Sequence, residues 1–167
     1  MSNLNTRANA LAERLLLGAN TLATFAEGLS GSEWNQPVLG DGRTIGVVVH
    51  HVANVYPLEI ELAQVLASGN PITEATMDVV NQMNADHAKE FADISKREAI
   101  QLLRQNSKMA ADTVRAFTDA ELDNSATVSL YANAPLTTQF FIEDHALRHS
   151  FHHFDKIKKT IKKQFQL

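Results

Sequence analysis

The 167-residue sequence contains no cysteine. This absence excludes a disulfide framework, a thiolate zinc finger, an iron–sulfur cluster and a cysteine nucleophile. A bound metal ion would therefore need nitrogen and oxygen ligands from the protein.

Several motifs of catalytic sites are also missing. The sequence has no glycine-rich phosphate loop, no H-E-x-x-H zinc motif and no segment that resembles a nucleophile elbow. A ferritin-like di-iron bundle requires Glu-x-x-His on paired helices, whereas Glu143 precedes His145 by only two residues.

Long uncharged apolar runs are absent near the N-terminus, where Arg7, Glu13 and Arg14 interrupt the apolar residues. These charges argue against a signal-peptide core and a membrane span, so we expect a cytoplasmic protein without a membrane partner. The net charge is −4, and the one basic segment is KIKKTIKK at residues 156–163. Lysines near a helix C-terminus interact favourably with the helix dipole, which explains this segment without a ligand. Because the chain is also negatively charged overall, we expect no nucleic-acid partner.

Hydrophobic residues make up 44% of the chain and follow a helical period almost throughout. The pattern predicts one all-α domain over residues 1–167. Trp34 is expected to cap the core from a loop, and Thr44 to act as an N-cap. No strand is expected, and residues 118–135 are predicted to be irregular. The predicted helices cover residues 4–28, 44–67, 73–94, 97–117 and 136–165.

The predicted last helix contains the densest group of reactive side chains, in the segment DHALRHSFHH at residues 144–153. His145, His149 and His152 are separated by four and three residues, so they project from one stripe of a helix. His153 follows His149 by four residues and permits an alternative pair, but its projection is displaced from that stripe.

Helical projection also separates the histidines earlier in the chain. His51 projects with apolar residues toward the core, whereas His50 projects with polar residues toward water. His87 lies in a polar segment, which favours a solvated side chain. His51, His145 and His149 therefore form the predicted metal site, with three nitrogen ligands from two helices and the fourth position open to water or substrate. Such a donor set suits Zn²⁺ or Ni²⁺.

Apolar or imidazole side chains occur on nearly all sides of the predicted last helix. A helix of this kind is either central to the bundle or packs against another subunit. We favour a homodimer.

Three segments resemble the DinB-like (YfiT-like) superfamily of small helical metal-binding proteins: TIGVVVHHVANV, MDVVNQMNADHA and DHALRHSFHH. The resemblance implies a four-helix bundle of up-down-down-up order, with residues 73–94 as a helical crossover between the second and third bundle helices. It implies His51, His145 and His149 as ligands, with His152 near the metal. It also implies dimers and, where members have an assigned activity, metal-dependent chemistry on a small molecule, often a low-molecular-weight thiol.

Three functional hypotheses follow. The first is a metal-dependent transferase or hydrolase that acts on a small molecule. The second is a non-catalytic, stress-associated protein that binds a metal or a small ligand. The third is a metal-free helical interaction protein whose histidines line a polar cavity.

Overall fold

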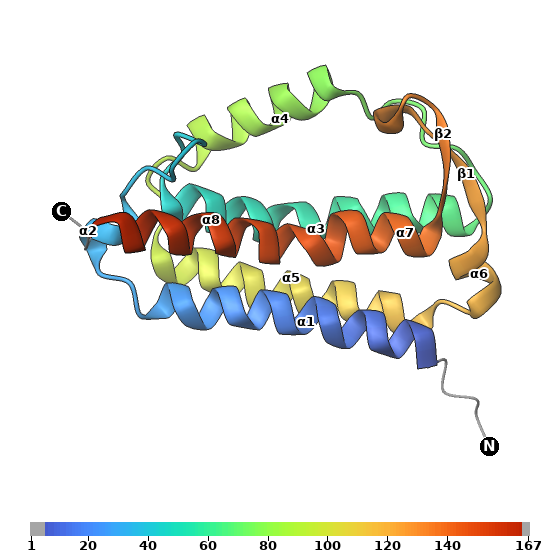
Figure 1. Cartoon of the computed structure of the whole chain (residues 1–167), viewed down its shortest axis with the longest axis horizontal. Coiled ribbons are helices and arrows are strands. Elements are labelled where there is room, and N and C mark those ends of the chain that lie inside the picture. Colours follow the sequence, from blue (N-terminus) through green and yellow to red (C-terminus); the bar gives the residue numbers. More distant parts are fainter. Residues whose placement is uncertain (1–5, 165–167) are drawn as a thin grey trace.

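The computed structural model describes residues 6–164. The predicted start of the first helix, at residue 4, and the predicted end of the last helix, at residue 165, lie outside this range. Four long rods form a bundle (Figure 1). The predicted all-α four-helix bundle is confirmed. The rods are α1 (Thr6–Glu27), α3 (Ile45–Ala67), α5 (Lys96–Ala116) and the continuous run of α7 (Thr138–Ile142), a π-helical turn (Glu143–Leu147) and α8 (Arg148–Gln164).

Contacts between side chains fix the relative directions of the rods. Arg14 of α1 forms an ion pair with Glu143, and farther along both rods Phe25 packs against Phe154, so α1 and α8 run in the same direction. Arg104 of α5 pairs with Glu27 of α1, and the later Arg115 pairs with the earlier Glu13, so α5 runs in the opposite direction. In Figure 1, α3 runs parallel to α5.

The helix α3 begins where the sequence predicts. Thr44 is the N-cap, and its side chain accepts a hydrogen bond from the backbone N–H of Val47 at 3.3 Å. Trp34, at the end of the short helix α2 (Gly31–Trp34), is buried and donates to the carbonyl of Ile94 at 3.0 Å. Trp34 caps the core as predicted, but it does so from the short helix α2 and not from a loop.

A helix and a small hairpin cover one side of the bundle (Figure 1). α4 (Met77–Glu90) is shorter than the predicted helix of residues 73–94, and His87 is its one buried residue. After α6 (Asp119–Asp123), strands β1 (Ser125–Val128) and β2 (Ala134–Thr137) pair antiparallel around a short 3-10 turn (Ser129–Tyr131). The prediction of no strand was wrong, because four-residue strands are too short to show clear alternation.

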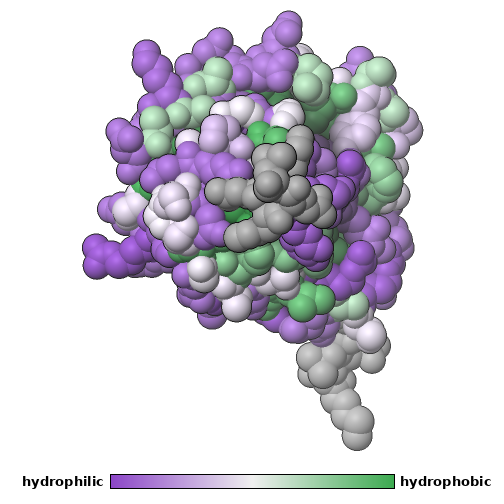
Figure 2. Space-filling model, turned by 60° about the vertical axis from the view of Figure 1, so that its left-hand side comes forward, coloured by the Kyte–Doolittle hydropathy of each residue, from purple (hydrophilic) through white to green (hydrophobic). Residues whose placement is uncertain are grey.

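The apolar side chains lie inside the bundle, and the face in Figure 2 is mostly hydrophilic with small separate hydrophobic patches. Among residues 6–164, no helix is both long and apolar enough to cross a membrane. Leu17 of α1 and Phe151 of α8 remain exposed. The homodimer and the cytoplasmic location stay predictions.

Candidate metal centre

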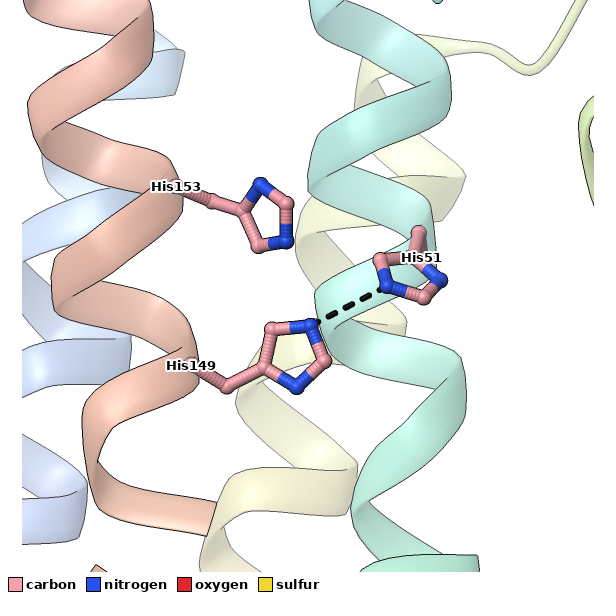
Figure 3. Close-up of side chains that lie close together, drawn as sticks. All are labelled: His51, His149 and His153. Atoms are coloured by element: carbon pink, nitrogen blue, oxygen red, sulfur yellow. Dashed lines mark hydrogen bonds between the residues drawn. The ribbon is translucent and has the colours of Figure 1, made fainter. Parts of the chain in front are cut away.

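Three histidines from two helices meet inside the bundle (Figure 3). His51 comes from α3, and His149 and His153 come from α8. One ring nitrogen of each residue lies within 4.8 Å of the corresponding atoms of the other two, and the Nε2 atoms of His51 and His149 are 3.0 Å apart. His51 and His153 are buried, and His149 is partly buried.

Regular helix geometry accounts for this grouping. His149 and His153 are four residues apart on α8, so their rings lie on one stripe, with centroids 4.9 Å apart. His51 lies on the inner side of α3, two turns after the N-cap Thr44, and its ring centroid is 4.9 Å from that of His149.

Glu59 fixes the orientation of His149. Its Oε1 lies 2.7 Å from His149 Nδ1, and the Glu59 side chain is buried. Because a carboxylate only accepts, Nδ1–H of His149 donates to it, and in the neutral imidazole that a metal requires, the lone pair is on Nε2. This carboxylate–histidine arrangement is common behind metal-binding imidazoles.

The protonation states suit metal binding. Burial, followed by the nearby His149 and Arg43, lowers the pKa of His51 to about 2. The same causes, in the same order, lower the pKa of His153 to about 2. Both imidazoles are therefore neutral at neutral pH, as metal ligands must be.

The spacing also suits a metal ion. In a tetrahedral site with Zn–N bonds of about 2.0–2.1 Å, two nitrogen ligands lie about 3.3–3.4 Å apart. The His51–His149 separation of 3.0 Å needs only a small adjustment to reach this value. His153 Nδ1 is buried without a hydrogen-bond partner among the described residues, so the ring keeps unused binding capacity. The three side chains fit a divalent ion.

The sequence predicted that His145 lies together with His51 and His149. In the structure, His153 takes this place and His145 lies elsewhere. Its Nε2 lies 3.0 Å from Tyr131 Oη, and its ring stacks on Phe141 with centroids 4.4 Å apart. The pairs 145/149 and 149/153 have the same spacing, so helical projection alone does not decide between them. The axial alignment of α8 against α3 decides, because four residues correspond to about 6 Å along a helix.

His50 and His87 also differ from their predicted positions in solvent. His50 Nδ1 and His87 Nε2 are 2.8 Å apart, both side chains are buried, and Phe91 packs against both rings. α4 covers this side of α3, which the periodicity of α3 alone did not reveal. His87 reaches His51 with a ring-centroid distance of 5.6 Å, so this pair borders the three-histidine group.

A pocket of about 150 Å³ opens beside the group. His152 is exposed and lines this pocket, so it lies near the site as predicted. Glu59 was not predicted from the sequence, because α3 contains two acidic residues, Glu59 and Glu61, and periodicity did not show which of them faces His149. The pocket is lined by Asp144, His145, Arg148, His149, His152 and His153.

The sequence profile of the DinB superfamily matches residues 14–157, which include every residue of the site. The chain belongs to the DinB superfamily. No curated protein sequence matches it.

The DinB fold is also evident in a solved structure, that of YfiT from Bacillus subtilis. The two chains are 15% identical and superpose with a TM-score of 0.76, covering 98% of this chain and 91% of YfiT. YfiT is described as a probable metal-dependent hydrolase with an unusual four-helix bundle topology. At this identity the likeness shows the shared fold.

Proposed function

We propose that this DinB protein is a metal-dependent enzyme, a hydrolase or a transferase, that acts on a small molecule. His51, His149 and His153 would hold a divalent ion, with Zn²⁺ and Ni²⁺ the expected choices. One observation carries the proposal: three imidazoles from two helices meet beside a pocket, and a buried carboxylate orients one of them.

Three protein ligands leave a coordination position for a small molecule. A divalent ion held in this way would act as a Lewis acid. It would lower the pKa of a bound water or thiol toward neutrality. His149 and His153 line the pocket and contribute to the nitrogen group, so a molecule in the pocket would reach the metal position. The description of YfiT as a probable metal-dependent hydrolase supports this proposal.

A second candidate function is non-catalytic binding of a metal or a very small ligand. The pocket volume of about 150 Å³ favours it, because pockets for drug-sized ligands occupy about 300–1,000 Å³. A turnover assay with a panel of esters and of electrophiles paired with low-molecular-weight thiols separates the two candidates.

Metal analysis of untagged protein, purified without chelator, tests the proposal. We expect close to one equivalent of a divalent ion, or uptake of one equivalent on titration. Each of the single substitutions His51→Ala, His149→Ala and His153→Ala should abolish tight metal binding. His145→Ala is the matched control, because it removes an imidazole from the same pocket and should leave metal affinity within a few fold of the original.

Two results would contradict the proposed site. One is less than about a tenth of an equivalent after purification, with no uptake on titration. The other is loss of binding in His145→Ala with binding retained in His153→Ala, which would restore the ligand set predicted from the sequence.

A further inference from the structure

Tyr131, Asp144 and His145 form a hydrogen-bonded cluster at the edge of the pocket, which we call the tyrosine cluster. Tyr131 Oη donates to Asp144 Oδ2 and lies 3.0 Å from His145 Nε2. The second carboxylate oxygen of Asp144 accepts from Arg148 Nη1 at 2.9 Å. Residues from the hairpin and from the π-helical turn thus meet at one point.

The cluster determines the tautomer of His145. A tyrosine hydroxyl has one proton, and the Tyr131 proton is donated to the carboxylate of Asp144. Tyr131 Oη can therefore only accept from His145, so the hydrogen of the neutral imidazole is on Nε2. Nδ1 keeps its lone pair, and no described residue forms a hydrogen bond with it.

The ring of His145 is fixed next to the metal centre. It stacks on Phe141 with an interplanar angle of 29°, and it lines the same pocket as His149 and His153. Its Nε2 is occupied by Tyr131, so Nδ1 is the ring nitrogen left for a molecule in the pocket.

Burial and the charged groups of neighbouring elements shift the pKa of His145. Burial is the largest influence and lowers its pKa, while Glu59 from α3 and the adjacent Asp144 act in the opposite direction. His149 and Arg148 from α8 act in the same direction as burial. The imidazole is therefore neutral at neutral pH and able to accept a proton.

We propose that His145 is the proton-accepting catalytic residue of this pocket, and that Tyr131 and Asp144 are positioning residues that hold its tautomer. This inference rests on the proposed function. The π-helical turn supplies both Asp144 and His145, and such turns occur frequently at functional sites.

Water or a thiol in the pocket loses its O–H or S–H proton to Nδ1 of His145, and the bonding electron pair stays on the oxygen or sulfur. That atom then bonds to the electrophilic carbon of the substrate. The bond from this carbon to the leaving group breaks, and its electron pair goes to the leaving group. The leaving group takes the proton from Nδ1, and nothing is oxidised or reduced.

The tautomer can be tested without any substrate, by NMR of protein labelled with ¹⁵N-histidine. At neutral pH we expect the His145 signals of an imidazole protonated on Nε2. Tyr131→Phe should convert them to a mixture of the two tautomers, and the exposed His152 should be unaffected. A wild-type His145 protonated on Nδ1 would overturn the proposal, because the lone pair would then be on Nε2, which faces Tyr131.

Kinetics of the metal-loaded protein, with p-nitrophenyl acetate as the probe, give the second test. His145→Gln should lower kcat about 10²- to 10⁴-fold and leave KM and metal affinity within a few fold. Tyr131→Phe should lower kcat less and shift the acidic limb of the pH–rate profile. Lys159→Gln, at an exposed position on α8 outside the pocket lining, is the control and should change neither quantity.

The outcomes separate this inference from the proposed function. If His145→Gln turns over the probe at the wild-type rate, the catalytic role is wrong although the metal centre stands. If His145→Gln loses the metal, His145 is a ligand and the proposal is wrong. If the wild-type protein binds no metal, the proposed function fails, and the tautomer measurement still decides whether Tyr131 and Asp144 position His145.

Discussion

Glu59 of α3 accepts a hydrogen bond from His149 of α8 across the interface between the two helices, with 2.7 Å between Oε1 and Nδ1. The contact joins a buried carboxylate to an imidazole whose other nitrogen belongs to the three-histidine group. It therefore links the packing of two helices to the proposed binding of a metal ion.

Glu59→Gln should weaken metal binding about 10- to 100-fold, the usual cost of losing such a partner. The amide has nearly the same shape, but it lacks the negative charge that a carboxylate places behind a metal-bound imidazole. Competition with a chromophoric chelator measures the affinity. Glu61→Gln, at an exposed position on the same helix, is the control; an equal loss in both variants would show that Glu59 has no special role.

The apoprotein should lose stability as the pH falls below about 6.5. A histidine whose pKa is lowered on folding binds its proton more tightly in the unfolded chain, so acid favours unfolding. The pKa values of His51 and His153 are about 2 in the folded protein, against an ordinary value of 6.5. Each residue should therefore lower the free energy of unfolding by about 1.4 kcal/mol for every pH unit below 6.5. Urea denaturation at pH 7.5 and at pH 5.0 measures this loss, and equal free energies of unfolding would contradict it.

His87→Ala should loosen α4. The substitution leaves His50 Nδ1 buried without its partner and removes the one buried side chain of α4. An unsatisfied buried polar group costs about 1–3 kcal/mol. Hydrogen exchange of the amides in α4 should accelerate more than exchange in α1. Met83→Ala, at an exposed position on α4, should leave exchange unchanged, and slow exchange of α4 in His87→Ala would show that other contacts hold the helix.

Gly46→Ala should destabilise the protein by about 1–3 kcal/mol, the typical cost of overpacking. A Cβ atom at this position would lie 2.5 Å from Trp34 Nε1 and 2.6 Å from Trp34 Cε2. Thermal unfolding measures the effect. Gly31→Ala meets nothing within 4 Å and should be close to neutral; equal melting temperatures for both variants would mean that Trp34 moves aside without cost.

The sequence was sufficient to predict the elements that are long and begin with a clear signal. Thr44 located the start of α3, and the resulting projection correctly placed His51 inside the bundle. Periodicity describes a single helix, so it could not show that α4 buries His50 and His87 against each other.

The choice between His145 and His153 depended on information that local sequence does not contain. Both are four residues from His149, and only the axial position of α8 against α3 distinguishes them. Glu59 and Tyr131 were not predicted for the same reason. Each reaches its histidine from a distant part of the chain, and a pairing of that kind depends on tertiary packing.

The π-helical turn at Glu143–Leu147 makes the length of this segment as important as its composition. A π-helical turn contains one residue more than an α-helical turn. Because the wider turn takes up that residue locally, deleting one residue there would allow α7 and α8 to merge into a regular helix without rotating α8. His149 and His153 would still face α3, and the change would fall on Asp144 and His145, which lie in the wider turn. The extra residue therefore serves the tyrosine cluster and not the three-histidine group.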